Sequence, residues 1–163
     1  MFDVIPITSE KQTDCGATCM QMLLAYYGQD VSLDTLIHEC GTKVNGCSGG
    51  DLLRAARAHG LNDIIAYQMD AAEVARQDRP SIIWWTYNHW CICCGKNSNG
   101  DVVICNPDRG RFSIDPGSFA SMYTGVAIFN GVPEDLPEPE YTTNELANAA
   151  VILLGLDEQN TNA

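Results

Sequence analysis

A cysteine near the start of this 163-residue chain is placed where a thiol can act as a nucleophile. Cys15 lies in the stretch Asp14-Cys15-Gly16-Ala17, at the predicted start of a helix. A thiol attacks a carbonyl carbon as the thiolate, and the unpaired N–H groups at a helix start favour that anion. Gly16 is expected to let a substrate backbone approach closely. Asp14 is expected to cap the helix, although its charge opposes thiolate formation. We therefore predict that Cys15 is a nucleophile with a lowered pKa.

His89 is the predicted general base for this cysteine. It follows an aromatic segment, residues 84–88, and begins a predicted strand. Asn106 lies after the next predicted strand, across a hairpin, and could orient the imidazole; Asp108 would serve the same purpose chemically. A strand histidine that faces a helix cysteine, with a third group behind it, is the arrangement of papain. The other two histidines, His38 and His59, lie on predicted helices and are interpreted as surface or cap residues.

The elements that must position these residues are helices first and strands afterwards. Apolar periodicity predicts three helices, each followed by a glycine, over residues 15–27, 32–40 and 48–59. Period-two patterns predict strands over residues 63–69, 81–86, 89–95, 102–105, 111–114 and 126–129. A capping box at residues 70–73 opens a short helix, and another helix is predicted over 115–123. This order predicts an α+β fold, with N-terminal helices packed on a mostly antiparallel sheet.

Composition and charge exclude several classes of function. The net charge is -12, which argues against a nucleic acid partner. There is no apolar run of the ~20 residues that a membrane span needs, and no basic and apolar leader, so we expect a cytoplasmic protein without a membrane partner. Residues 132–163 are predicted to be an acidic, proline-rich linker and a C-terminal helix, separate from a domain at 1–131. That helix could pack on the domain or bind a protein partner.

Eight cysteines are many for this length, and we interpret them as free, mostly buried thiols. The alternative is a zinc site built from the cysteines near His89, since zinc prefers tetrahedral Cys and His ligands. On a strand, Cys91 and Cys93 would share a face with His89 while Cys94 points away. The usual paired two-residue spacing is missing, so we expect no metal and no cofactor. The residues weighed for this site are His89, Cys91, Cys93, Cys94 and Cys105, with Cys40 and Cys47 as more distant candidates.

The same residues resemble a known family. The segment 14–28, with its Cys-Gly-Ala helix ending in Tyr-Tyr-Gly, is similar to the opening of C39-type peptidases. Residues 46–61 resemble the next helix of that family, and Asn88-His89-Trp90 resembles its histidine site. Asn106-Pro107-Asp108-Arg109-Gly110 resembles its Asp-Pro-x-x-Gly segment, and residues 113–129 resemble its closing helix and strand. The resemblance covers roughly residues 10–130.

The resemblance implies a papain-like cysteine peptidase fold and a bacterial or phage origin. Many members cut leader peptides after a double glycine, often as the N-terminal domain of an ABC exporter. Carried over, Cys15 is the nucleophile, His89 the general base, and Asn106 the third member where the family usually has Asp. A peptide or protein is then the expected substrate, cut after small residues such as Gly-Gly.

One departure from the family leaves an alternative open. The family carries an oxyanion-hole Gln six residues before the nucleophile, where this chain has Ser9. Gln12, three residues before Cys15, is the candidate oxyanion donor. If no donor is present, the alternative is a catalytically weak or inactive module that binds a peptide or protein. Trp84, Trp85 and Trp90 would then line a peptide groove or belong to the core.

Overall fold

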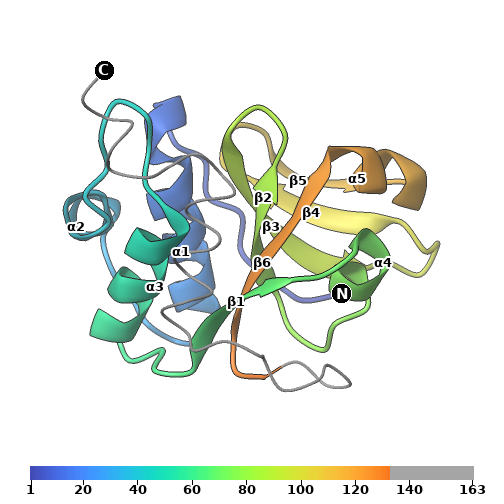
Figure 1. Cartoon of the computed structure of the whole chain (residues 1–163), viewed down its shortest axis with the longest axis horizontal. Helices are drawn as coiled ribbons and strands as arrows, with labels where there is room; N and C mark the ends of the chain where they lie inside the picture. Colours follow the sequence, from blue (N-terminus) through green and yellow to red (C-terminus); the bar gives the residue numbers. More distant parts are fainter. Residues whose placement is uncertain (133–163) are drawn as a thin grey trace.

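A computed structural model describes residues 1–132, which form an α+β fold (Figure 1). The prediction of helices followed by an antiparallel sheet is confirmed. The helices are η1 (Gln12–Asp14), α1 (Cys15–Tyr26), α2 (Leu33–Glu39), α3 (Gly49–Ala58), α4 (Ala71–Ala75) and α5 (Pro116–Met122). The strands are β1 (Ile64–Gln68), β2 (Ser81–Trp85), β3 (His89–Lys96), β4 (Val102–Asn106), β5 (Gly110–Ile114) and β6 (Tyr123–Asn130). The predicted linker and C-terminal helix lie outside the described residues.

The sheet places β3 and β4, the strands that carry the candidate site, next to each other. Its order is β1-β6-β2-β3-β4-β5, and all neighbours are antiparallel. His89 begins β3 and Asn106 ends β4, and Ile92 of β3 pairs with Cys105 of β4. Because antiparallel neighbours run in opposite directions, the start of β3 and the end of β4 meet. His89 and Asn106 therefore lie side by side.

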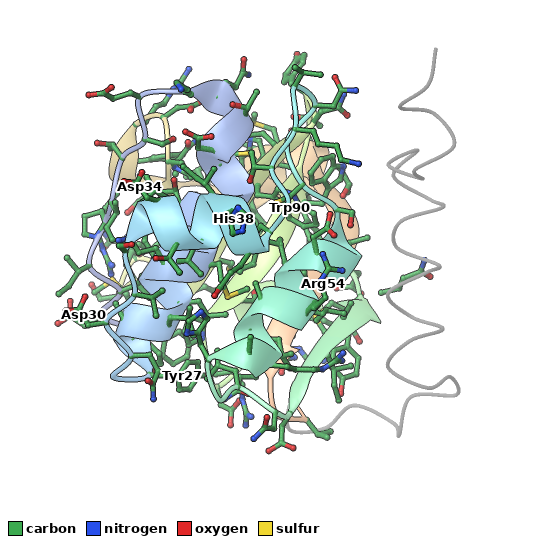
Figure 2. All side chains as sticks on the ribbon, turned by 90° about the vertical axis from the view of Figure 1, so that its left-hand side faces the viewer. Tyr27, Asp30, Asp34, His38, Arg54 and Trp90 are labelled. Carbon is green, nitrogen blue, oxygen red and sulfur yellow. The ribbon has the colours of Figure 1, made fainter. Side chains whose placement is uncertain are left out.

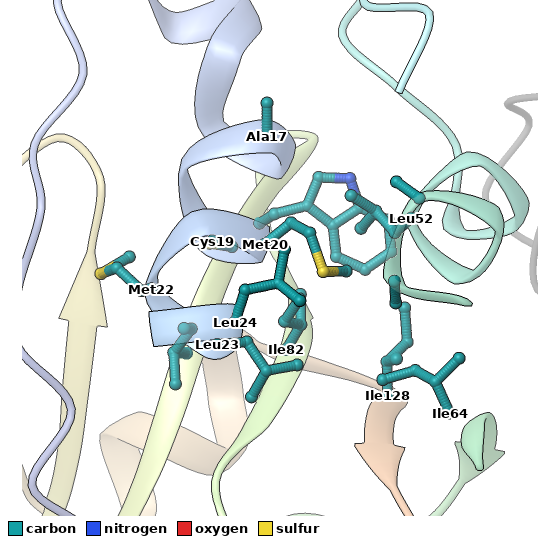
Figure 3. Packing of buried hydrophobic residues seen from close by; sticks show 14 of the residues in the cluster. Ala17, Cys19, Met20, Met22, Leu23, Leu24, Leu52, Ile64, Ile82 and Ile128 are labelled. Carbon is teal, nitrogen blue, oxygen red and sulfur yellow. The ribbon is translucent and has the colours of Figure 1, made fainter. Parts of the chain in front are cut away.

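Helices cover both faces of the sheet, and each face has its own apolar core. In Figure 1, α1, α2 and α3 lie on one side and α4 and α5 on the other. Figure 3 shows the larger core, where Met20, Leu23 and Leu24 of α1 pack with Ile82 of β2. The smaller core contains Phe119 of α5, Val74 of α4 and the opposite face of the strands. Such burial from both sides fixes the register of the strands, since a one-residue slip would move every apolar side chain to the wrong face.

The outer surface of the helical layer is polar. Figure 2 looks onto this side, where exposed Asp34 and His38 of α2 and Arg54 of α3 face outward. His59 at the end of α3 contacts Glu39 at the end of α2 through its Nε2 atom. The interpretation of His38 and His59 as surface or cap residues is thus confirmed. Within this described part of the chain, no helix is long and apolar enough to cross a membrane.

The predicted helix ends follow from local capping, with one exception. Ser48 and Asp51 form a capping box at α3, and Asp70 and Glu73 form one at α4. Gly28 ends α1 with φ 82°, a conformation that glycine adopts without strain. Asp14 occupies the N-cap position of α1, but its side chain makes no capping hydrogen bond. The prediction of Asp14 as a side-chain cap was wrong because η1 continues directly into α1, so the chain does not enter the helix from an extended conformation.

Replacing Ser48 with alanine is expected to destabilise the domain by about 1 kcal/mol. The substitution removes the hydroxyl that accepts from Asp51 N–H and donates to the Asp51 carboxylate. Urea unfolding followed by circular dichroism measures the change. Ser98→Ala, at an exposed position in the β3–β4 turn, is the matched control. Equal losses from both substitutions would show that the cap contributes nothing.

Candidate active site

Cys15 lies at the junction of η1 and α1, and its side chain is only 3% exposed. Burial raises the pKa of its thiol above the ordinary value, and the carboxylate of Asp108 raises it further. Backbone N–H groups of Trp90 and Gly16 act in the opposite direction but do not overcome burial. The expectation of a lowered pKa was therefore wrong, because the loss of water around the sulfur outweighs the helix start. A base that removes the proton would therefore be needed to make Cys15 a nucleophile.

Gly16 has a different role from the one expected. A Cβ atom at this position would lie 2.3 Å from Cys47 Sγ and 3.0 Å from Trp90 Cδ1. Gly16 is buried, and its missing side chain accommodates these two neighbours rather than a substrate backbone. Trp90 is further fixed by donating its indole N–H to the carbonyl oxygen of Cys47, 3.1 Å away. Close packing thus holds the loop before α3 against the start of α1.

His89 is held by two side chains from the end of β4. Its Nε2 atom lies 2.9 Å from Asn106 Oδ1 and 3.6 Å from Asp108 Oδ2. Asn106 Oδ1 also accepts the backbone N–H of Asp108, at 2.7 Å, so the orientation of the amide is fixed. An acceptor at Nε2 places the ring proton of the neutral imidazole on that nitrogen. Nδ1 is then left as the basic nitrogen.

The basic nitrogen of His89 is buried and has no hydrogen-bond partner within residues 1–132. The next residue, Trp90, directs its backbone N–H to the Cys15 thiol. The strand that begins with His89 therefore runs directly against the sulfur. Of the predicted residues, His89, Asn106 and Asp108 are therefore in direct contact, and the residue after His89 contacts Cys15.

The turn that leads into His89 is strained. Tyr87 and Asn88 have φ values of 65° and 55°, in the left-handed region that large side chains rarely adopt. The pairing of Trp85 with His89 and a hydrogen bond from Thr86 N–H to Met122 O hold the turn in place. Tyr87 is 87% exposed, so the strain is not offset by burial of its ring. Strain of this kind collects at functional sites.

Two cavities meet at this turn. One, of about 400 Å³, contains Cys15, and the other, of about 310 Å³, contains His89 and Asn106. Gln12 and Tyr87 line both, so the two cavities adjoin at these residues. The first cavity has no charged side chain; its lining is Gln12, Thr13, Cys15, Val44, Asn45, Gly46, Cys47, Trp84, Tyr87, Asn88 and Trp90.

The structure separates the two candidate oxyanion residues. Ser9 donates its N–H to Pro107 O and its hydroxyl to Lys11 O, and it lines neither cavity. Gln12 is exposed and lines both the Cys15 and the His89 cavity. Gln12 thus lies beside both cavities, although its spacing from the cysteine differs from the family pattern.

The tryptophans serve both core and cavity. Trp84 and Trp90 pack edge to face, with centroids 4.4 Å apart, and also form a wall of the Cys15 cavity. Trp85 contacts Phe119 in the smaller core and lines the His89 cavity.

All eight cysteines are free and buried, as predicted, with Cys91 and Cys93 on the face opposite Cys94. In the part of the chain that the structure describes, no group of His, Cys, Asp and Glu side chains is arranged to hold a metal ion.

Three residues of the site were missed in the sequence. Val44 and Asn45, in the loop between α2 and α3, line the Cys15 cavity, as does Tyr87. Val44 is 88% exposed and therefore forms part of the rim. A loop without periodicity gives no sign of which side chains reach the site. For Tyr87, the position directly before Asn88-His89 was the only available signal.

This fold, with a cysteine at the start of α1 and a histidine at the start of β3, is that of a papain-like domain. The chain belongs to the Peptidase C39 family, whose sequence model matches residues 4–132. Peptidase domains of this family are cysteine peptidases.

Solved structures support the same assignment. A double glycine motif protease from an AMS/PCAT transporter, in complex with the leader peptide, is 26% identical, with a TM-score of 0.70 over 77% of this chain and 89% of that one. The peptidase domain of Streptococcus ComA, a bi-functional ABC transporter, is 19% identical, with a TM-score of 0.67 over 77% and 96%. The second likeness supports the fold alone.

A curated relative is the lactococcin-A transport/processing ATP-binding protein LcnC of Lactococcus lactis subsp. lactis. It is 27% identical over 86% of this chain and 21% of its own length. The chain spans about a fifth of the length of the curated relatives that it matches.

Proposed function

We propose that the domain is a cysteine peptidase in which Cys15 attacks a peptide bond and His89 acts as general base. The observation that carries the proposal is the orientation of His89. Asn106 occupies Nε2, and Nδ1 is left buried, without a partner among the described residues, beside the strand that contacts the Cys15 sulfur. A basic nitrogen without a partner, on the residue before Trp90, which contacts the Cys15 thiol, is suited to removing the proton of that thiol.

The reaction follows from these positions. His89 Nδ1 takes the proton of Cys15 as the sulfur attacks the scissile carbonyl carbon, and Asn106 stabilises the imidazolium through Nε2. His89 then returns the proton to the leaving amine, which departs and leaves a thioester on Cys15. Water, deprotonated by the same imidazole, hydrolyses the thioester and restores the thiol. Every step uses side chains of this chain alone.

Gln12 is proposed to stabilise the oxyanion together with the backbone N–H of Cys15. Removing one such donor costs about 10²–10³ in kcat. We therefore expect Gln12→Ala to lower kcat by about that factor, in steady-state cleavage of a fluorogenic peptide. Lys11→Ala, at the exposed neighbouring position outside both cavities, is the control. If the two variants cleave equally well, the oxyanion is stabilised by other donors.

Asn106 and Asp108 are proposed to share the task of supporting His89. Asn106→Ala removes a hydrogen bond to the imidazolium, worth about 1.5–3 kcal/mol, so kcat/KM is expected to fall roughly 10–100-fold. Asp108→Asn should cost no more than about fivefold, because the carboxylate is partly exposed. The Asp108 carboxylate also raises the pKa of Cys15. Its removal should therefore make the thiol easier to deprotonate, which offsets part of the loss.

A double-mutant cycle tests this division of roles, since both side chains act on one imidazole. The combined variant is expected to lose less activity than the product of the single losses. Asp101→Asn, in the β3–β4 turn, controls for the removal of a surface charge. Strict additivity, or a larger loss from Asp108→Asn than from Asn106→Ala, would make Asp108 the third member instead.

We further propose that the substrate is a peptide cut after small residues such as Gly-Gly. The support is the double glycine motif protease among the similar structures and the uncharged, tryptophan-walled cavity around Cys15. Matched peptides that carry Gly-Gly, Ala-Ala or Val-Val before the scissile bond test this by mass spectrometry. Gly-Gly should be cleaved fastest and Val-Val slowest. Equal rates would remove the substrate assignment but not the peptidase.

A second function, a module that binds a peptide without cutting it, is favoured by one observation. Burial of Cys15 raises its pKa and leaves a thiol that is unreactive unless His89 acts on it. Under this alternative, the same peptides bind wild type but remain intact. Cleavage that depends on Cys15 eliminates it.

A further inference from the structure

Two cysteines outside the candidate active site lie in contact between β3 and β4. Cys94 and Cys105 both point into the larger core, with their Sγ atoms 3.6 Å apart, and both are fully buried. The proposed peptidase reaction uses neither. Cys105 is nevertheless next in sequence to Asn106, which holds His89.

Cys105 has the surroundings of a reactive thiol. Arg111 of β5 places its Nη1 atom 3.7 Å from Cys105 Sγ, and Cys94 donates its S–H to the same sulfur. These two donors hold the pKa of Cys105 below its ordinary value, against the opposing effect of burial. A positive charge beside a thiol is the usual means of making a cysteine sensitive to oxidation. Cys94, as the donor, is the neighbouring thiol that can resolve the oxidised form.

The pair lies beneath the first residues of the chain. Phe2 donates its N–H to Cys94 O, and Arg111 donates to the carbonyl oxygens of Phe2 and Val4. The Cys105 thiol donates its S–H to Val4 O, at 3.7 Å. Residues 1–4 thus form a strap across the two thiols. A small oxidant would reach the sulfur atoms once these few hydrogen bonds are released.

We propose that Cys105 and Cys94 are a peroxide-sensitive dithiol that closes to an intramolecular disulfide. The Cys105 thiolate attacks one oxygen of hydrogen peroxide, the O–O bond breaks, and hydroxide leaves, which gives a sulfenic acid. Cys94 sulfur then attacks the Cys105 sulfur, and the sulfenic oxygen leaves as water with the Cys94 proton. The two thiols lose two electrons in total, and the peroxide is reduced to two waters.

Closure has a consequence for the candidate active site, and this part rests on the proposed function. A disulfide requires an S–S separation of about 2.05 Å, so the two sulfurs must approach by roughly 1.5 Å. Because Cys105 directly precedes Asn106, the movement of β4 is expected to alter the hydrogen bond that His89 Nε2 donates to Asn106 Oδ1. Oxidation of the dithiol is therefore expected to lower peptidase activity, and a thiol reductant is expected to restore it.

The disulfide is tested in the full chain carrying Cys15→Ala, so that the candidate nucleophile does not consume the oxidant. After treatment with hydrogen peroxide and blocking of free thiols, trypsin releases Cys94 within residues 77–96 and Cys105 within 97–109. A linked peptide pair, two hydrogens lighter than the sum and separated by reductant, is the expected result. Fragmentation should assign the link to Cys94. Peroxide treatment that yields no link between these peptides would overturn the proposal.

Variants distinguish the two thiols and their neighbour. Cys105→Ser should abolish the link, while Cys94→Ser should leave a Cys105 sulfenic acid that dimedone traps. Cys93→Ser, one residue from Cys94 but on the opposite face of β3, should still form the link. Arg111→Gln should slow alkylation of Cys105 at pH 7 about tenfold for each unit by which its pKa rises, and Arg111→Lys should slow it less. Equal rates of Cys105 alkylation in the chain with Arg111, in Arg111→Gln and in Arg111→Lys would contradict the role of Arg111.

The link is measured in the chain in which only Cys15 is substituted, so misfolding of the Cys94, Cys105 or Arg111 variants cannot decide the outcome. A linked peptide in a protein that cleaves no substrate would leave the dithiol standing and remove the peptidase proposal. Cleavage by a protein that never forms the link would remove the dithiol proposal and leave the peptidase proposal standing.

Discussion

Replacing Cys15 with alanine is expected to abolish peptide cleavage, with a fall in kcat of about 10⁴ or more. The sulfur is the only atom in the proposed reaction that forms a covalent bond to the substrate, and alanine offers none. The measurement is single-turnover cleavage of a Gly-Gly peptide, followed by mass spectrometry of the products. Alanine is close in volume to cysteine, so the fold should persist.

The matched control is Cys19→Ala. Cys19 lies on the same helix and is completely buried, but it lines neither of the two cavities that meet at the candidate site. Its loss should change kcat by no more than a few fold. A Cys15→Ala chain that cleaves as fast as the Cys19→Ala chain would place the nucleophile elsewhere.

Replacing His89 with alanine is expected to lower kcat/KM by about 10³–10⁴ at pH 7. Burial raises the pKa of Cys15, so without a base the thiolate is scarce below that raised value. Because the thiolate forms only as the pH approaches this raised pKa, the residual activity of the variant should increase with pH beyond the ordinary cysteine range. Wild type should already be active at neutral pH.

His38→Ala, at an exposed position on α2, is the control for loss of an imidazole. It should retain the activity and pH profile of wild type. A His89→Ala chain with the wild-type profile would show that another group deprotonates Cys15.

Most of the fold could be predicted because the signals that end its elements are local. Capping boxes and left-handed glycines mark helix ends in the sequence itself, as at Ser48 and Gly28. The final strand was predicted too short: β6 begins at Tyr123, three residues before the predicted start. Gly125, with φ 98°, and Thr124 interrupt the apolar pattern there, but pairing of Trp85 with Tyr123 extends the strand. Such pairing depends on the distant strand β2 and leaves no local trace.

The members of the candidate site could also be predicted, but their electrostatics could not. Cys15, His89 and Asn106 were identified by residue type and by the order of the elements that carry them. Whether a helix start lowers the pKa of a cysteine depends on how deeply the tertiary structure buries the sulfur. At Cys15 the effect of burial is the larger one, and the pKa is raised. Likewise, the role of Gly16 depends on Cys47, a residue from another loop. Contacts between segments far apart in the chain decide both.

The most direct test of the account is the rate at which Cys15 is alkylated by iodoacetamide between pH 5 and 10, in wild type and in His89→Ala. Peptide mass spectrometry resolves Cys15 from the other cysteines. With His89 as general base, wild-type Cys15 is expected to react well below the pH at which an ordinary thiol, with a pKa of about 8.5, becomes reactive. Without His89, the reaction should move above that value, since burial then acts unopposed by a base. Superimposable profiles for the two proteins would contradict the claim that His89 takes the proton of Cys15.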